Sequence, residues 1–268
     1  MHRPIGRNIV RGLQYLIYRY LLRKSHLLAK CNYFGARFKC KTEDVIGRHL
    51  FKKGVHEKEN TDYIIKHIKL EDGELALDIG ANIGWFSVLL SKLASDEARI
   101  FAFEPEPSNF ELLEHNLKQN ECANVVAVNK GVSDKDGVMS LYLHPDKNRG
   151  RHSLIPDSSL RKIEVDIVSL DSFFNATPPG KIRFLKIDIE GYEYFAFKGA
   201  QKLLAHVPMI LMEYSPHLYN IGFTNDDLLD TLMDLSFRPH LLDSDGITEV
   251  DRKTLSDRQD QFDIFWMK

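Results

Sequence analysis

The sequence predicts an α/β protein built around an open, mostly parallel sheet of seven strands in the Rossmann-like arrangement. Short apolar runs alternate along the chain with stretches whose apolar residues recur at helical spacing, which is the pattern of β-α-β units. The apolar runs are nearly continuous, as expected of strands that helices cover on both faces. At 268 residues, with 43% hydrophobic and 28% charged residues, the chain suits one globular domain with a sizeable core.

Seven apolar segments are predicted as strands, and the last is expected to close the sheet in the antiparallel direction. They cover residues 75–79, 98–104, 125–128, 182–187, 208–213, 238–242 and 261–266. Residues 43–74 are predicted to form a helical cap before the first strand, and apolar spacing predicts a helix that ends near residue 119. Asp134-Lys-Asp-Gly137 predicts a hairpin turn into an alternating strand at 138–143, which returns at 165–168.

The first predicted strand is apolar except for Asp78, and Gly80 and Gly84 bracket the turn that follows it. We expect this turn to present free backbone N–H groups of a helix N-terminus to a nucleotide, although an ordinary strand-to-helix connection is the alternative. A dinucleotide fingerprint would need glycine where the chain has Asn82 and Trp85. The spacing D-x-G-x-N-x-G instead favours S-adenosylmethionine over NAD. The predicted cofactor-binding residues of this turn are Asp78, Gly80, Ala81, Asn82 and Gly84.

Polar residues follow the ends of several other predicted strands. Glu104 ends the second strand, about 20 residues after the glycine turn, where a carboxylate would accept the ribose hydroxyls of the cofactor. Asn129, after the third strand, is a candidate partner of the adenine base, although an Asn at a strand end is as often a turn former. Asp188 and Glu213 end the fourth and fifth strands, and Glu190 follows closely. Because parallel strands end at one edge of a sheet, we expect these residues around one cleft.

Three motifs together resemble those of the FkbM family of S-adenosylmethionine-dependent methyltransferases. They are Leu77-Asp-Ile-Gly-Ala-Asn-Ile-Gly84, Phe103-Glu-Pro-Glu-Pro107 and Leu185-Lys-Ile-Asp-Ile-Glu-Gly-Tyr-Glu193, and the third is the most specific. The resemblance covers roughly residues 45–268. It implies a class I methyltransferase fold, S-adenosylmethionine as cofactor, and O-methylation of a sugar, a glycolipid or glycan, or a secondary metabolite. A catalytically silent scaffold protein on the same fold, recruited to a membrane surface, is the alternative from another class.

Proximity supplies much of the catalysis of a methyl transfer, but an alcohol nucleophile also benefits from a general base. Asp188, Glu190 or Glu213 could accept its proton, and Asp188 is the first candidate because it ends a buried strand. Glu190 and Glu193 could instead satisfy the N-terminus of the following helix. A divalent metal held by Asp188 with Glu190 or Glu213 is a further route to hydroxyl activation. No cluster has diagnostic ligand spacing, so no metal site is predicted.

The polar stretch 146–159 lacks any periodicity and is expected to lie over the ligand edge of the sheet. Arg149, Arg151 and His152 within it could recognise an anionic or sugar substrate, and Arg151 and His152 are the predicted substrate-binding residues. A solvated loop is the alternative for each of them.

A second charged stretch, with His56 and Glu57, comes before a predicted helix. We expect a solvated cluster here, with Thr61 as the candidate N-cap of the helix. Only a minor role in the active site is assigned to Glu57.

The N-terminal 42 residues carry ten basic side chains and no acidic one, so residues 43–268 carry 26 basic against 38 acidic side chains. This asymmetry predicts a basic N-terminal arm at 1–42 and a methyltransferase domain at 43–268. Apolar residues recur at helical spacing in the arm, which predicts an amphipathic helical extension: Ile9, Leu13, Leu16, Ile17, Tyr20 and Leu21. This helix could pack on the domain, or it could lie on an anionic membrane surface.

Three cysteines, Cys31, Cys40 and Cys122, form no C-x-x-C pair and indicate reduced thiols of a cytoplasmic protein. Arg19 interrupts an apolar run that is already too short to span a bilayer, and no secretory signal is evident. The predicted location is therefore the cytoplasm, with possible peripheral contact at a membrane through the arm. The predicted partner is a small-molecule or glycan acceptor, and no nucleic acid is expected.

Overall fold

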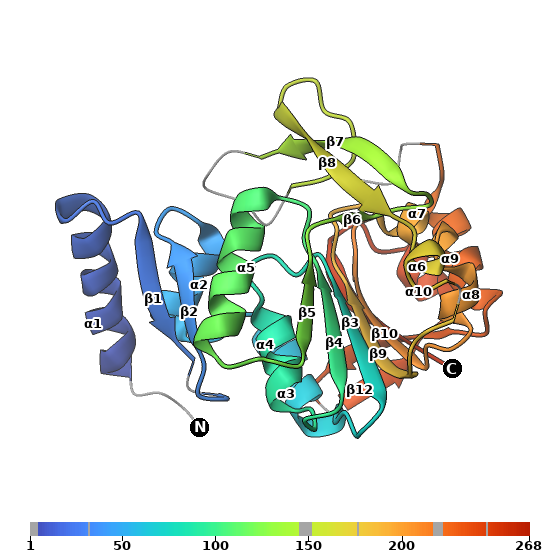
Figure 1. Cartoon of the computed structure of the whole chain (residues 1–268), viewed down its shortest axis with the longest axis horizontal. Helices are drawn as coiled ribbons and strands as arrows, with labels where there is room; N and C mark the ends of the chain where they lie inside the picture. Colours follow the sequence, from blue (N-terminus) through green and yellow to red (C-terminus); the bar gives the residue numbers. More distant parts are fainter. Residues whose placement is uncertain (1–4, 32, 145–151, 176, 217–221, 245) are drawn as a thin grey trace.

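The α/β fold with an open, mostly parallel sheet is confirmed. The computed structural model describes residues 5–31, 33–144, 152–175, 177–216, 222–244 and 246–268. The strands of its central sheet are β3 (Glu74–Ile79), β4 (Arg99–Phe103), β5 (Val125–Val128), β9 (Lys181–Ile187), β10 (Met209–Tyr214), β11 (Arg238–Asp243), β12 (Gly246–Glu249) and β13 (Phe262–Met267). These eight strands of the described chain are ordered β12-β11-β13-β10-β9-β3-β4-β5, and Figure 1 shows helices on both sides of them.

The direction of the strands identifies the ligand edge of the sheet. Strands β10, β9, β3, β4 and β5 are parallel, whereas β13 runs antiparallel to both β10 and β11. The chain moves outwards from β3 through β4 to β5 and then returns to β9 on the other side of β3. Ligands of open α/β sheets bind at such a change of direction, beyond the carboxyl ends of the strands.

All seven predicted strands are present, but the predicted number is wrong by one. The additional strand is β12, which pairs with β11 alone and so forms an edge of the sheet. Its sequence, Gly-Ile-Thr-Glu, is short and contains a single large apolar residue. An edge strand buries little apolar surface, so its sequence need not contain the apolar run from which a strand is predicted.

Helices cover both faces of the central sheet (Figure 1). The first face carries α3 (Lys58–His67), α4 (Trp85–Lys92) and α5 (Pro107–Gln119); the second carries α6 (Leu170–Phe173), α7 (Glu193–Lys198), α8 (Gln201–Leu204), α9 (Asn225–Met233) and α10 (Arg252–Ser256). Alternate residues of β3 serve the two faces, because Ala76 packs with the first group and Leu77 with the second. The strand is therefore buried on both sides, as its apolar run predicts.

A small separate sheet covers the carboxyl end of the central one. It consists of β6 (Gly131–Val132), β7 (Gly137–Leu143) and β8 (Arg161–Val168), in the order β6-β8-β7. The strands predicted at 138–143 and 165–168 are present, and β8 starts four residues earlier than predicted. The predicted hairpin turn at 134–137 is wrong, because the strands on either side of it, β6 and β7, each pair with β8 and not with each other. Leu141 of β7 packs with Tyr192, which lies in the turn after β9. Figure 1 shows this sheet on one end of the central strands.

The N-terminal arm contains more structure than the predicted helix. After α1 (Ile5–Leu16) and the π-helix η1 (Ile17–Leu21), β1 (His26–Lys30) and β2 (Arg37–Lys41) form an unpredicted hairpin, and α2 (Val45–Lys53) follows. The backbone N–H of Lys39 donates to Asn116 Oδ1 of α5 (2.7 Å), and the Phe38 ring lies 5.1 Å from that of Trp85. Packing therefore joins residues 26–41 to the central sheet. The boundary at residue 42 stays a prediction that rests on charge.

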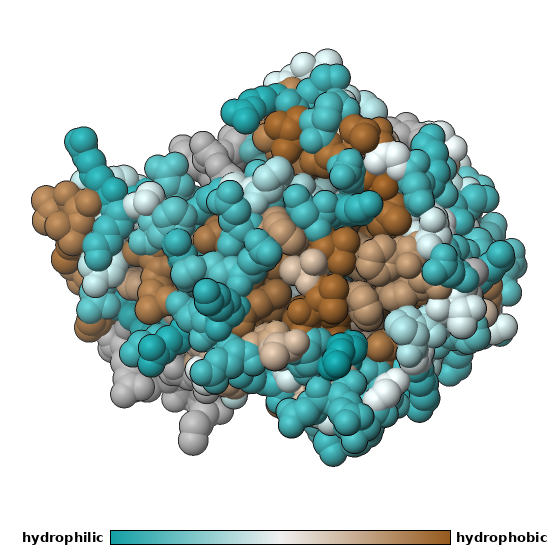
Figure 2. All heavy atoms as spheres, in the orientation of Figure 1, coloured by the Kyte–Doolittle hydropathy of each residue, from teal (hydrophilic) through white to brown (hydrophobic). Residues whose placement is uncertain are grey.

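Helix α1 docks on the domain by a face other than its apolar stripe. Tyr15 is buried, and its hydroxyl donates to the carbonyl oxygen of Thr42 (2.8 Å). By contrast, Tyr20 and Leu21 of the stripe are 67% and 76% exposed. Figure 2 shows hydrophobic residues at this outer edge of the molecule. The helix therefore packs on the domain, as one of the two predicted alternatives has it, but its apolar stripe stays exposed. Along the described chain, the helices are too short or too polar to cross a bilayer.

Candidate functional site

A cavity opens at the carboxyl ends of β3, β4, β9 and β10, under the small sheet. We call it the strand-end cavity; among the predicted site residues it is lined by Gly80, Ala81, Asn82, Glu104, His152, Asp188, Glu190 and Glu213. Residues of the small sheet, including Leu141, close it from above. The structure thus brings most of the predicted cofactor and catalytic residues around one space. Arg151 and Arg149 lie outside the described residues.

Gly80 allows the turn after β3 to touch the turn after β9. Its φ of +79° is in the left-handed region, and a Cβ atom here would lie 1.9 Å from the backbone oxygen of Asp188. Any side chain would therefore push the two turns apart. The glycine that marks the predicted cofactor turn also holds the turn that carries the candidate catalytic acids.

For the turn itself, residues 80–84, the expectation of free N–H groups is wrong. The N–H groups of Gly80 and Ala81 both donate to the carbonyl oxygen of Phe103, at 3.0 and 2.9 Å. Those of Asn82, Ile83 and Gly84 donate to Glu104 Oε2, Asn82 Oδ1 and Ala81 O, respectively. The turn uses its donors to bind itself to the end of β4. It is thus suited to a cofactor that carries a sulfonium cation and no phosphate, which needs no cradle of N–H donors.

Glu104 is buried at the end of β4 and faces the cavity with a fixed carboxylate. Its Oε2 accepts from the N–H of Asn82 (2.8 Å), and its Oε1 accepts from the N–H of Glu106 (3.0 Å). Burial raises the pKa of Glu104 to about 7, even though both N–H groups favour the charged form. The Asn109 side chain is a third hydrogen-bond partner, and a carboxylate can accept about four hydrogen bonds, so Glu104 keeps capacity for a further donor. This arrangement fits the two vicinal hydroxyls of a ribose.

Three predicted cofactor residues lie behind the cavity wall. The hydroxyl of Ser87 donates to Asp78 Oδ2 (2.5 Å), so Asp78 anchors α4 to β3. A Cβ atom on Gly84 would lie 2.7 Å from Leu113 Cδ1, so this glycine lets α4 approach α5. The Asn129 amide donates to the carbonyl oxygens of Glu104 and Pro105. All three support the turns that line the cavity, and a direct contact of any of them with the cofactor stays a prediction.

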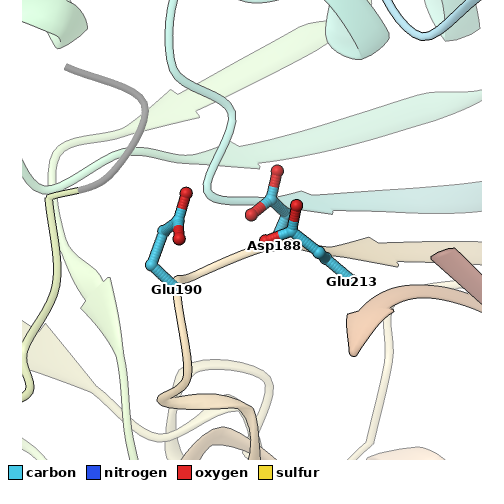
Figure 3. Close-up of side chains that lie close together, drawn as sticks. All are labelled: Asp188, Glu190 and Glu213. Atoms are coloured by element: carbon cyan, nitrogen blue, oxygen red, sulfur yellow. The ribbon is translucent and has the colours of Figure 1, made fainter. Parts of the chain in front are cut away.

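Three carboxylates converge on the acceptor side of the cavity. Asp188 and Glu190 come from the turn after β9, Glu213 comes from β10, and one oxygen of each lies within 4.8 Å of the others. Figure 3 shows the groups of Asp188 and Glu213 close together, with Glu190 pointing toward the same space. Asp188 Oδ1 and Glu213 Oε2 are buried and have no hydrogen-bond partner in the described chain. Such oxygens require a donor from a ligand.

Glu193 holds the acidic turn in shape. It is buried at the start of α7, and its Oε1 accepts from the N–H groups of Ile189 (3.1 Å) and Gly191 (3.3 Å). Glu190 and Gly191 between them adopt positive φ values of 54° and 90°. Of the predicted alternatives, satisfaction of backbone N–H groups therefore describes Glu193 well. The turn that Glu193 holds in shape directs Glu190 toward the cavity.

Lys186, which sequence reasoning did not single out, supplies the positive charge of this side. It is buried on β9, and its Nζ donates to Asp188 Oδ2 (3.1 Å) and lies 5.2 Å from the centre of the Phe86 ring. Burial opposes the charged form, but Asp188, Glu57 and Asp78 raise the pKa of Lys186 above its ordinary value. A lysine inside an apolar strand is the signal by which the sequence could have revealed it.

Glu213 is the neutral member of the acidic group. Burial, followed by the nearby charge of Asp188, raises the pKa of Glu213 far above that of an ordinary carboxyl group. At neutral pH it therefore holds a proton and can donate a hydrogen bond. The three carboxyl groups could offer oxygen ligands to a divalent cation. The Lys186 ammonium already balances the charge of Asp188.

His56 and Glu57 also line the cavity, although the sequence predicts a solvated cluster for them. They lie between α2 and α3, and His56 Nε2 is 3.0 Å from Glu57 Oε1. Helix α3 begins at Lys58, so Thr61 is inside it and is not its N-cap. Nothing in the local sequence could place this pair, because the fold of the helical cap brings it to the cavity.

The sequence profile of the Methyltransferase FkbM domain matches residues 78–239. The Hexuronic acid methyltransferase AglP of Haloferax volcanii is 25% identical over 190 residues, which cover 71% of this chain and 74% of the relative. The 31-O-demethyl-FK506 methyltransferase FkbM of Streptomyces tacrolimicus is 32% identical over 116 residues, 42% of this chain and 43% of the relative. A solved Methyltransferase FkbM from Methylobacillus flagellatus superimposes with a TM-score of 0.49 and 17% identity, covering 98% of this chain and 60% of that one.

Proposed function

Because the chain belongs to the FkbM family of methyltransferases, we propose that it transfers a methyl group to a hydroxyl of a sugar, a glycolipid or glycan, or a secondary metabolite. S-adenosylmethionine is the methyl donor of this class of enzyme. The proposal concerns the acceptor, about which the relatives differ. One relative is named for a hexuronic acid and another for the O-methyl group of a demethylated natural product.

The pair of unpartnered oxygens, Asp188 Oδ1 and Glu213 Oε2, is the observation that carries this proposal. Both belong to residues that line the cavity, and an acceptor with hydroxyl groups would supply the donors that these oxygens lack. Glu104 lies across the same cavity, where it would hold the ribose of the donor. Donor and acceptor would then share one enclosed space, as a direct methyl transfer requires.

The residues divide the work between holding the donor and holding the acceptor. Glu104 would accept the ribose hydroxyls, while Gly80 and Asp78 keep the turn beside it in place. Asp188, with Glu190 and protonated Glu213, would orient the acceptor hydroxyl toward the methyl group. Much of the rate of such a transfer comes from this orientation, because the attacking oxygen, the carbon and the sulfur must lie in line. His152 lines the same cavity and would contact the rest of the acceptor.

The test is transfer of labelled methyl groups from S-adenosylmethionine into an extract of sugars, glycolipids and small metabolites. We expect a product whose label survives mild alkali, because a methyl ether is stable where a methyl ester is cleaved. Alkali-labile label would identify a carboxylate acceptor and contradict the hydroxyl proposal. Calorimetric binding of S-adenosylmethionine without any transfer would support the scaffold alternative.

We also propose that the arm binds an anionic membrane surface. The exposed stripe of α1 and η1 offers apolar side chains such as Leu16, Tyr20 and Leu21. Arg23 and Lys24 follow directly and line a surface hollow with further basic groups. An apolar helix face beside basic residues gains both burial and Coulomb energy at such a surface, at about 1 kcal/mol per basic residue.

Point substitutions test the arm better than truncation, because removal of residues 1–42 would also remove Phe38 and Cys40 from the core. We expect the double variant Leu16→Glu, Leu21→Glu to lose sedimentation with vesicles of phosphatidylcholine and phosphatidylserine. Val138→Glu, at a 61% exposed apolar residue of β7, is the matched control and should sediment like the native protein. Binding of the native protein should weaken as salt rises. Equal sedimentation of the double variant and the control would reject the membrane contact.

A further inference from the structure

His56 and Glu57 form a partly buried imidazole–carboxylate pair that the proposed function has not used. His56 Nε2 lies 3.0 Å from Glu57 Oε1, and the Asn60 amide donates to the other oxygen of Glu57 (3.0 Å). The same amide nitrogen donates to Asp263 Oδ2 of β13 (2.7 Å), which ties the pair to the central sheet. Both oxygens of Glu57 therefore have donors, and the carboxylate holds the imidazole in one orientation.

This contact decides which ring nitrogen of His56 carries the proton. A carboxylate at Nε2 favours the tautomer with hydrogen on that nitrogen, so Nδ1 is left as a proton acceptor. Nδ1 has no hydrogen-bond partner among the residues that the structure describes. His56 is one of the residues that line the strand-end cavity, and its side chain is 23% exposed. In its neutral form, the His56 imidazole thus offers an acceptor nitrogen to the cavity that contains Asp188 and Glu104.

The His56 ring is held by the helix that follows the cofactor turn. It packs edge-on against Trp85 and at an angle to Phe86, with ring centres 6.4 Å apart in each case. The Trp85 indole donates to the Thr61 hydroxyl (3.0 Å), which donates to the carbonyl oxygen of His56 (2.8 Å). Backbone and ring of His56 are thereby positioned by α4, the element that begins at the donor side.

Two of the other candidate bases, Asp188 and Glu213, are poorly suited to accept a proton. Asp188 already binds the buried Lys186 ammonium (3.1 Å), so protonation of its carboxylate would weaken that ion pair. Glu213 has its pKa raised by burial and by neighbouring charge, so it already holds a proton at neutral pH. Asp188 and Glu213 can orient a hydroxyl, whereas an imidazole nitrogen without a partner can accept its proton.

We propose that His56 is the general base of the methyl transfer and that Glu57 is its positioning residue. The inference rests on the proposed O-methylation. The acceptor oxygen forms a bond to the methyl carbon while the carbon–sulfur bond breaks, and the electron pair of that bond goes to sulfur. The hydroxyl proton goes to His56 Nδ1, and the Glu57 carboxylate stabilises the resulting imidazolium. His56 then releases this proton to solvent through its exposed edge.

Charged groups from three elements set the basicity of His56. Burial lowers the pKa of the imidazole, but Glu57 at the start of α3 more than offsets this, and the pKa lies above its ordinary value. Asp188 after β9 raises it further, whereas Lys186 of β9 lowers it. His49 of α2 lies close enough to His56 for the charges of the two rings to repel each other. The rate of methyl transfer should therefore rise with pH as the imidazole loses its proton.

The kinetic test uses the native chain and the variant His56→Gln, with labelled S-adenosylmethionine and the mixed acceptor extract. A glutamine amide can still donate to Glu57 but cannot act as a base. We expect the initial rate to fall ~10²–10⁴-fold, the size of a lost general base, while calorimetric affinity for S-adenosylmethionine is retained. The rise of the rate with pH, which we call the pH-dependent limb, should vanish as well. His49→Gln, which leaves the lining of the cavity intact, is the matched control and should keep both the rate and the limb.

A second test examines the native histidine by spectroscopy, which needs no acceptor, and adds the kinetics of a Glu57 variant. Nitrogen-15 spectra of the imidazole in the native protein should show hydrogen on Nε2, and Glu57→Gln should lower the His56 pKa because a stabilising negative charge is lost. The kinetic limb of Glu57→Gln should move to lower pH in parallel. Hydrogen on Nδ1, or an unchanged His56 pKa in Glu57→Gln, would overturn the proposal.

The two proposals fail in different ways. A native protein that transfers no label would defeat O-methylation itself, and the base with it. An active native protein whose His56→Gln variant keeps the rate and the pH-dependent limb would defeat the base alone and return the role to Asp188.

Discussion

The two sides of the strand-end cavity are built in contrasting ways. On the donor side, Glu104 and the turn that begins at Gly80 come from neighbouring β-α units, and backbone hydrogen bonds hold them together. On the acceptor side, His56, Lys186 and Glu213 come from three distant parts of the chain, and side-chain charges hold them. The residues of the donor side are therefore close enough in the sequence to form recognisable motifs, whereas those of the acceptor side are brought together only by the fold.

The two sides also differ in how their buried carboxyl groups are stabilised. The donor side has one buried carboxylate at the cavity, and two backbone N–H groups stabilise it. The acceptor side gathers several carboxyl groups around one buried ammonium, so its stability depends on keeping Glu213 protonated and Asp188 paired. Backbone donors cannot be mutated away, whereas a single lysine can. The acceptor side should therefore be the more sensitive to single substitutions.

Loss of Lys186 should have the largest effect. Lys186→Met would leave Asp188, Glu57 and Asp78 without the cation that offsets their charge, and we expect the free energy of unfolding to fall by about 3–5 kcal/mol. Lys181→Met, at a 71% exposed lysine that pairs with Glu74, is the control and should cost about 0–1 kcal/mol. Urea denaturation measures both. Equal losses would show that the acceptor side does not depend on its buried cation.

Gly80→Ala tests whether the two sides are mechanically joined. The new Cβ atom would lie 1.9 Å from Asp188 O in a left-handed backbone conformation, so we expect a loss of about 2–5 kcal/mol in unfolding free energy. Gly73→Ala has a similar φ of +75° and no atom within 4 Å, so it should lose only about 1–2 kcal/mol. Denaturation curves of the two variants isolate the clash. If they coincide, the turns after β3 and β9 can separate freely.

Glu104→Ala sharpens the assignment of the donor side. Removal of charge-assisted hydrogen bonds to the ribose should weaken S-adenosylmethionine binding by about 1.5–3 kcal/mol, roughly 10- to 150-fold in dissociation constant. Isothermal calorimetry provides the measurement. Glu111→Ala, on the exposed face of α5, is the matched control and should bind normally. Native affinity in Glu104→Ala would mean that another group holds the ribose.

The smallest expected effect is a pH dependence of donor binding. The pKa of Glu104 is about 7 in the free protein, and ribose hydroxyls favour its charged form. Below about pH 7 the carboxyl group must lose a proton before it binds, so affinity should fall by up to about tenfold per pH unit as pH decreases. Above that pH the affinity should level off. In Glu104→Gln this slope should disappear, and a native protein with a flat profile from pH 5.5 to 8 would contradict the assignment.

The predicted residues that line the cavity share a local signature. Gly80 and Glu104 each follow an apolar strand, and the order of strands alone places them at the ligand edge. Asp188 and Glu213 were placed for the same reason, and the structure brings them together. Asn129 follows the same rule, but its amide supports the backbone of Glu104 and Pro105. Position at a strand end therefore locates a residue without fixing the direction of its side chain.

The residues that escaped prediction have no such signature. Lys186 is hidden within an apolar strand, and His56 lies in a polar connection that resembles a solvated turn. The hairpin of β1 and β2 was also missed, since its alternation is short and mixed with lysine and arginine. Each of these features is recognised only by what lies opposite it, such as Asn116 for β2 or Asp188 for Lys186.

Periodicity and turn chemistry in the chain were enough to specify the α/β fold, the glycine turn and the ring of strand-end acids, because strands, helices and turns follow from contacts between near neighbours. The charge balance of the acceptor side, the His56–Glu57 pair and the outward-facing stripe of α1 arise from contacts between residues far apart in the chain. Burial and partners determine pKa values and side-chain exposure, and both are properties of the packed fold. Lys186 illustrates the difference. The sequence shows that β9 contains a lysine, but only the fold places Asp188, Glu57 and Asp78 around it.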